Sequence, residues 1–179
     1  YFISLICFSI SLLIKTYAIF LSPVFLSIFL IEPEKNLKKT IALFSLGLSL
    51  LPFLCWRNFI NQFPAGIPAS DWLYNKDNIR FKGAFFHWLF EVRLFTLIMG
   101  ITGIIPFALG ILKKGKSTFV YLVWLASLFA FSVIFAGGNI QHDYYQIIYL
   151  PIICLLIGRG VDFILSLPNS ITNRLFSWI

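Results

Sequence analysis

The side chains best suited to binding or catalysis gather in one short segment, "GGNIQHDYYQIIYLP", which lies between two apolar runs. Within it, five consecutive residues all carry hydrogen-bonding groups, of four kinds: His142, Asp143, Tyr144, Tyr145 and Gln146. Tyrosine combines a flat apolar face with a phenolic donor, which suits sugars and lipid headgroups, and imidazole and amide groups add hydrogen bonds. We therefore expect His142, Tyr144, Tyr145 and Gln146 to bind substrate at the rim of a cavity.

Asp143 needs a separate role, because a carboxylate beside a phosphate is repulsive. We expect it to orient His142 or a nearby cation. The alternative for the whole segment is an aromatic anchor at the membrane interface with incidental polar residues.

Two cations are candidates for binding phosphate. Lys15 interrupts an otherwise almost uncharged N-terminal stretch, which as one helix would be ~46 Å long, too long for a hydrocarbon core of ~30 Å. We therefore expect a turn at Lys15, between two helices. Arg80, in "NIRFKG", offers a planar donor fork that matches phosphate. We predict that Lys15 and Arg80 converge on one phosphate, the alternatives being a snorkelling lysine and a solvated arginine.

Two pairs of charged residues have helical spacing. His87 and Glu91 are four residues apart, and we expect a local solvated pair rather than a proton-transfer pair. Arg159 and Asp162 are three residues apart, and we expect them to neutralise each other.

Composition then defines the elements that must position these residues. The chain of 179 residues is 59% hydrophobic and 12% charged, which is too apolar for a soluble domain. We expect an all-α integral membrane protein, because lipid offers no partners for backbone groups outside helices. The formal charge of +7 is scattered between apolar runs, which argues against nucleic-acid binding.

We predict a single multi-span region, 1–179, with about six transmembrane helices, the first of them truncated. The predicted spans are 1–14, 17–31, 40–56, 93–112, 117–136 and 145–166. A long loop, 57–92, is expected to carry a short amphipathic helix that leads into the fourth span. Gly100, Gly103 and Gly110 in that span are expected to permit close helix packing.

Lysines in the short loops predict the orientation. The segments "EPEKNLKK" and "KKGK" place loops 32–40 and 113–116 on the cytoplasmic side by the positive-inside rule. Lys15, the long loop and loop 137–146 then share the external face. We expect a multi-pass protein of the plasma (inner) membrane with its active face outside.

The cysteines and histidines do not indicate a metal site. Cys7, Cys55 and Cys154 are far apart in apolar runs, and we expect buried, inert thiols. No metal and no cofactor is predicted.

Several segments resemble membrane glycosyltransferases with the C-type fold, a group that includes protein O-mannosyltransferases and lipid A aminoarabinose transferases. "SISLLIKTYAIFLSPVFLSIFL" resembles the helix–Lys–helix segment of this group, and "HDYYQIIYLPIICLLIGRGVDFI" is similar to its late "H-x-YY…P" segment. "WRNFINQFPAGIPASDW" and "FFHWLFEVRLFTLIMGITG" look like its later external loop and the span that follows. Together these motifs cover most of the chain.

The resemblance implies transfer of a sugar from a polyprenyl-phosphate carrier to a lipid, glycan or protein acceptor on the external face. Members of the group place an Asp or Glu base in their first external loop, and this chain has no counterpart of it. The catalytic base is therefore unknown; none of Asp71, Asp77, Glu91 and Asp143 matches it. We expect a C-terminal transmembrane fragment that is inactive alone.

Three other functions remain open. A transporter or lipid flippase would predict paired broken helices in two related halves, and no internal repeat is visible. An O-antigen polymerase or ligase would also act on carrier-linked sugars, but with arginine-rich external loops. The third is a scaffold without enzymatic activity.

Overall fold

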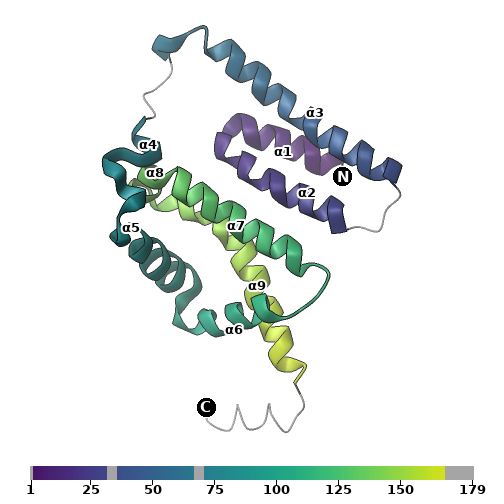
Figure 1. Cartoon of the computed structure of the whole chain (residues 1–179), viewed down its shortest axis with the longest axis vertical. Helices are drawn as coiled ribbons and strands as arrows, with labels where there is room; N and C mark the ends of the chain where they lie inside the picture. The colour runs from purple at the N-terminus through teal and green to yellow at the C-terminus, as the bar shows by residue number, and fades with distance from the viewer. Residues whose placement is uncertain (1, 32–35, 67–70, 168–179) are drawn as a thin grey trace.

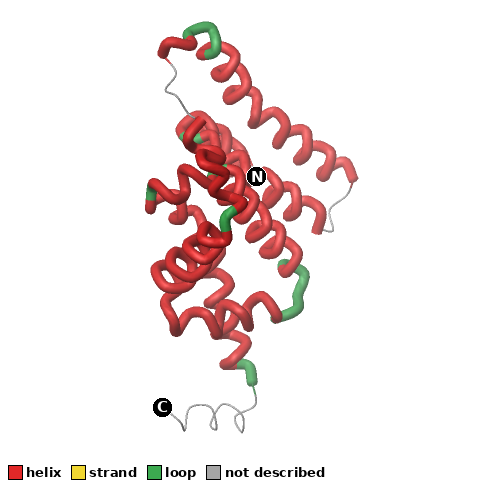
Figure 2. The backbone as a smooth tube through the Cα atoms, turned by 60° about the vertical axis from the view of Figure 1, so that its left-hand side comes forward, coloured by secondary structure: helices red, strands yellow, loops and turns green. Residues whose placement is uncertain are grey.

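The computed structural model describes residues 2–31, 36–66 and 71–167, and this part of the chain is built from helices and short turns without a strand (Figures 1 and 2). The predicted all-α class is therefore confirmed for the described residues. In chain order the elements are α1 (Phe2–Ile14), η1 (Thr16–Leu21), α2 (Ser22–Ile31), α3 (Asn36–Ile60), η2 (Pro64–Gly66), α4 (Asp71–Asn75), η3 (Lys76–Phe81), α5 (Gly83–His87), η4 (Trp88–Met99), α6 (Gly100–Leu112), α7 (Thr118–Ile134), α8 (Ala136–Gln141), η5 (Asp143–Tyr149) and α9 (Leu150–Leu165).

Each predicted span coincides with helix, but only some of the helices are long enough to cross a membrane. In the described part of the chain, three helical stretches are both long and apolar enough: Leu37–Ile60, Gly83–Leu112 and Asp143–Leu165. The other apolar helices are shorter: Phe2–Ile14, Thr16–Ile31 and Thr118–Ile134. A helix such as α1, with 13 residues, rises only ~20 Å, less than the ~30 Å of a hydrocarbon core. The structure is thus compatible with a membrane protein, and six crossings remain a prediction.

The helices form two groups that meet along α7. In the first group α1 lies beside α3, and a cluster that includes Phe8, Leu12 and Phe29 packs between the helices (Figure 1). In the second group α5, η4, α7 and α9 bury a cluster that includes Phe85 and Leu128. The groups are joined by η1 and α2, which pack against α7, where the Ser127 hydroxyl donates to the Phe20 carbonyl.

Helices α6 and α9 make the closest backbone contact, at two glycines. A side chain on Gly110 would collide with the Leu156 carbonyl, and one on Gly160 would collide with the Pro106 carbonyl. A β-carbon on Gly103 would lie 3.2 Å from the Ile157 side chain. The predicted role of Gly103 and Gly110 in close packing is therefore confirmed.

Gly100 has a different role from the one predicted. A side chain there would meet nothing within 4 Å, but its φ of +65° with ψ of 161° lies in a region that is essentially restricted to glycine. Gly100 is the first residue of α6 and directly follows η4, so the change in backbone conformation falls at the boundary between these two elements. The fourth predicted span is therefore bent at Gly100.

Large apolar side chains cover much of the outside, as expected for a surface that faces lipid. On α6, Ile101, Ile105 and Leu112 are all exposed. The free thiols of Cys7, Cys55 and Cys154 are exposed as well. The prediction of buried thiols is wrong because each cysteine lies on the outer face of its apolar helix.

Contacts between the helices define two ends of the bundle. The first, which we call the Lys15 end, contains the α1–η1 junction, α4, α8 and the last turn of α7. The second, the Lys113 end, contains the last turn of α6, the first turn of α7 and Arg159 of α9. In the predicted cytoplasmic loop 32–40, residues 32–35 lie outside the described residues.

Candidate functional site

Aromatic side chains from three segments meet at the Lys15 end, and we call them the aromatic cluster: Tyr17, Trp72, His142, Tyr144 and Tyr145. The His142 ring centroid lies 5.1 Å from that of Tyr144 and 5.5 Å from that of Trp72. Tyr145 lies 5.0 Å from Tyr144 and 5.6 Å from Tyr17. These distances are typical of interacting aromatic pairs.

Lys15 brings a positive charge to this cluster. Its Nζ lies 5.9 Å from the centroid of the Tyr144 ring, within the range of a cation–π contact. The backbone of Lys15 is extended (φ −142°, ψ 112°) and separates α1 from η1, so the predicted turn is confirmed. His142 is extended in the same way between α8 and η5, which places the imidazole beside its neighbours (φ −132°, ψ 114°).

The cluster is open to solvent on one side. Lys15 is exposed, and Tyr144 keeps 47% of its surface accessible, whereas Tyr145 keeps only 8%. Tyr145 therefore forms the floor of the site, while Lys15 and Tyr144 present a cation and an aromatic face to a ligand.

The glycine pair Gly137-Gly138 lets α4, which belongs to the predicted long loop, pack close to the aromatic cluster. A side chain on Gly137 would collide with the Trp72 carbonyl, and a β-carbon on Gly138 would lie 3.0 Å from Leu73 Cδ2. Both glycines lie within helix α8, against which α4 packs (Figure 1). They bring Trp72 beside His142, a role that their sequence position alone does not reveal.

Asp143 forms an ion pair with Arg93, a residue that the sequence reasoning missed. The Arg93 guanidinium also lies 4.8 Å from the centroid of the Trp88 ring. Asp143 is thus partnered by a nearby cation, one of its two expected roles. The sequence could have indicated this pair, because Arg93 belongs to a predicted span, where a charged side chain requires a partner.

Gln146 is buried instead of lying on the rim, where we expected it. Its side chain is 1% exposed, and Nε2 donates to the carbonyl oxygen and to Oδ1 of Asn139, at 2.9 and 3.1 Å. The buried backbone of α8 requires such a donor, because an unpaired carbonyl inside the protein is costly. Gln146 therefore stabilises the segment beneath the aromatic cluster.

Arg80 lies at the Lys15 end on a different element. Its Nη2 donates to the carbonyl of Ile134 at 3.2 Å, and its backbone N–H donates to Asn75 Oδ1 at 3.0 Å. Ile134 is the last residue of α7, so the guanidinium satisfies a free carbonyl where the helix dipole favours positive charge. Convergence of Arg80 and Lys15 on one phosphate stays a prediction.

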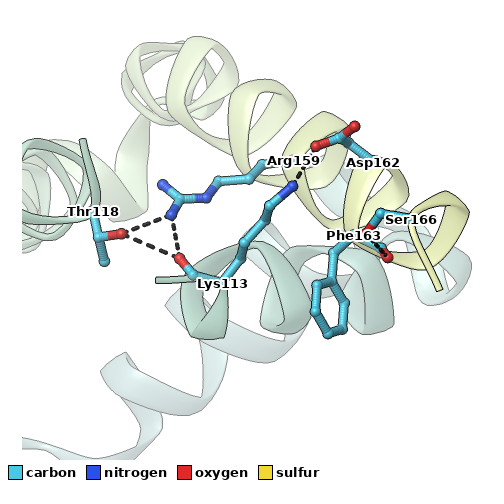
Figure 3. Close-up of polar contacts among 6 residues, drawn as sticks. All are labelled: Lys113, Thr118, Arg159, Asp162, Phe163 and Ser166. Atoms are coloured by element: carbon cyan, nitrogen blue, oxygen red, sulfur yellow. Dashed lines mark hydrogen bonds and ion pairs between the residues drawn. The ribbon is translucent and has the colours of Figure 1, made fainter. Parts of the chain in front are cut away.

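The two predicted helical pairs have opposite outcomes. His87 Nδ1 lies 2.9 Å from Glu91 Oε2 with both side chains exposed, so the local solvated pair is confirmed. The pairing of Arg159 with Asp162 is wrong: Asp162 pairs with Lys113, and Arg159 donates to the Lys113 carbonyl and to Thr118 Oγ1 (Figure 3). The Lys113 carbonyl, just after the last residue of α6, has no donor within that helix; it accepts from Thr118 Oγ1 and also attracts the guanidinium away from its helical neighbour.

No protein-family model, curated protein or solved structure matches this chain. Among the described residues, no group of three or more His, Cys, Asp and Glu side chains could hold a metal ion.

Proposed function

We propose that this chain is part of a glycosyltransferase of the plasma membrane. It takes a sugar from a polyprenyl-phosphate carrier and passes it to a lipid, glycan or protein acceptor on the external face. The supporting observation is the position of Lys15 above the exposed ring of Tyr144, at the edge of the aromatic cluster. A cation beside flat aromatic faces complements an anionic phosphate joined to a sugar.

Each residue of the site has a role in this proposal. Lys15 binds the phosphate of the carrier, and Arg80 supplies a second positive charge at the same end. Tyr144 covers the apolar face of the sugar, His142 hydrogen-bonds its hydroxyls, and Tyr145 supports both rings from below. These residues bind and orient the donor; no catalytic base is assigned.

In the membrane, the three long helices and the three shorter ones form six crossings. The Lys113 end carries the lysines of the "KKGK" loop, which favours the cytoplasmic side. The Lys15 end is then external. The prenyl chain of the donor remains in lipid while its headgroup lies at the height of Lys15.

Binding of undecaprenyl phosphate to the purified chain in detergent tests this proposal. We expect saturable binding that undecaprenol, which lacks the phosphate, does not reproduce. Lys15→Gln is expected to weaken it about tenfold, because a charge-assisted hydrogen bond contributes roughly 1.5–3 kcal/mol. Lys82→Gln removes an exposed charge of the long loop and is the matched control, expected to bind normally. Equal binding of undecaprenyl phosphate and undecaprenol would reject the proposal.

A lipid transporter is the second candidate, favoured by the broken helix at Gly100. Broken helices line the substrate sites of many transporters. Reconstitution into liposomes separates the two functions. Transbilayer movement of a fluorescent polyprenyl phosphate would favour the transporter, whereas binding without movement favours the glycosyltransferase.

A further inference from the structure

An apolar cavity lies between η4, α6, α7 and α9. Its volume is about 450 Å³, and residues of all four helices line it, among them Phe90, Leu94, Phe107, Leu125 and Ile153. Of the described residues in this lining, Tyr149 carries the polar group, and its hydroxyl is already hydrogen-bonded to Ser132 and to the Leu128 carbonyl. Water would find no free partners there, so the cavity suits a hydrocarbon chain.

A narrow crevice continues from this cavity toward the Lys113 end. The crevice shares Ile111 and Leu125 with the cavity, and Gly110, Thr118 and Tyr121 line it further along, but it has no room for a water molecule. A hydrocarbon chain in the cavity therefore cannot pass through the crevice, and it would reach the loop that joins α6 to α7 along the open side of the cavity, beside Ile111.

Positive charge gathers where the crevice ends. Arg159 donates to Thr118 Oγ1 at 2.7 Å and lies 5.1 Å from the Tyr121 ring, while its buried Nη1 has no partner (Figure 3). Lys114 and Lys116 are exposed on the loop beside it. Lys113 is neutralised by Asp162, which leaves the other three cations in excess.

We propose that this cavity and the cations at the Lys113 end together bind an anionic phospholipid. One acyl chain occupies the cavity, and the phosphate lies at Lys114, Lys116 and Arg159. Basic pockets between transmembrane helices are typical binding sites for anionic headgroups. This site is independent of the aromatic cluster and of the proposed function.

Native mass spectrometry of the purified chain in detergent tests the site, with dioleoylphosphatidylglycerol and dioleoylphosphatidylcholine as probes. We expect the anionic lipid to bind more tightly. The double variant Lys114→Gln/Lys116→Gln is expected to weaken it roughly 30-fold, the effect of removing two lysine charges near a lipid headgroup. Lys76→Gln/Lys82→Gln removes two exposed charges of the long loop and is the matched control, expected to bind normally.

The acyl chain is tested from inside the cavity. Ala126 lines the cavity, and Ala126→Phe is expected to displace the chain and to weaken phosphatidylglycerol binding. Ala126→Leu is a smaller change that serves if the first variant does not fold. Equal affinity for the two phospholipids would overturn the proposal. Normal binding to a folded Ala126 variant would also overturn it, because the headgroup would then bind without an inserted chain.

Discussion

Arg93 lies within a predicted span, and its two contacts explain how a charge is accommodated there. Asp143 neutralises the guanidinium, and the Trp88 ring covers one of its faces. The side chain is mostly buried, with 18% exposed, whereas Asp143 is 70% exposed. The pair joins η4 to η5, the element that also carries Tyr144 and Tyr145.

The first prediction concerns this pair. A double-mutant cycle of Arg93→Met and Asp143→Asn is expected to give a coupling free energy of about 0.5–1 kcal/mol, because one partner is exposed to solvent. Thermal unfolding of the four proteins in nanodiscs measures it. The same cycle on His87→Ala and Glu91→Gln, both exposed, is the control and is expected to give less. A coupling near zero for Arg93 and Asp143 would contradict their role as a tertiary link.

At the residue scale, local spacing predicted only part of the contacts. The His87–Glu91 pair follows from one helical turn, and Asp143 was expected near a cation. Arg93, however, is fifty positions away from Asp143, and the partner is chosen by how the helices pack. Arg159 and Asp162 have helical spacing, yet each finds another partner just after α6. Arg159 donates to the Lys113 carbonyl, and Asp162 pairs with the Lys113 side chain.

Helices α6 and α9 depend on two glycines at their crossing. The second prediction is that Gly160→Ala destabilises the chain by about 1–3 kcal/mol, because the added methyl group would force the backbones apart. Gly158→Ala is the control on the same helix, since a β-carbon there meets nothing within 4 Å. Thermal unfolding compares the two variants. Equal stability of the Gly160→Ala and Gly158→Ala variants would contradict a close backbone contact between α6 and α9.

Helix α4 reaches the site only because α8 presents glycine. The third prediction is that Gly137→Ala moves Trp72 away from His142 and weakens undecaprenyl phosphate binding about fivefold, which corresponds to roughly 1 kcal/mol. Gly83→Ala, also a helical glycine with no neighbour within 4 Å of the added carbon, is the control. If Gly137→Ala binds normally, Trp72 does not contribute to the site.

At the element scale, apolar runs predicted where the helices lie but not how they meet. The glycines of α6 could be identified as packing positions because they repeat within one span. Gly137 and Gly138 were expected in the loop 137–146 but lie in helix α8, and nothing local indicates that α4 returns to cover them. The break at Gly100 likewise depends on its φ, which an apolar sequence does not specify.

The whole molecule has two chemically different ends, and the fourth prediction concerns their sides of the membrane. Single cysteines would replace Lys39, Lys116, Asn61 and Lys76 in a background without the three exposed native thiols. We expect an impermeant maleimide added to intact cells to label positions 61 and 76 but not 39 and 116. Labelling of positions 61 and 116 from the same side would contradict the proposed orientation.

At this scale composition was sufficient for the all-α class of the described residues, and the three long apolar helices are compatible with the membrane environment that it also predicted. It could not specify the lengths of the helices, because polar turns at Lys15 and His142 divide the apolar runs. It also could not specify that α1–α3 and η4–α9 form separate clusters. These features depend on packing between distant segments.

The central claim is that the headgroup of a polyprenyl phosphate lies between Lys15 and the aromatic cluster. Photo-crosslinking tests this directly. The probe is an undecaprenyl phosphate analogue that carries a diazirine beside the phosphate, and peptide mapping of the product identifies the labelled segments. We expect labels on the peptides that contain Lys15 and Tyr144. Excess undecaprenyl phosphate should suppress them, and phosphatidylglycerol should not. Labels confined to the Lys113 end, or labels that undecaprenyl phosphate does not suppress, would contradict the claim.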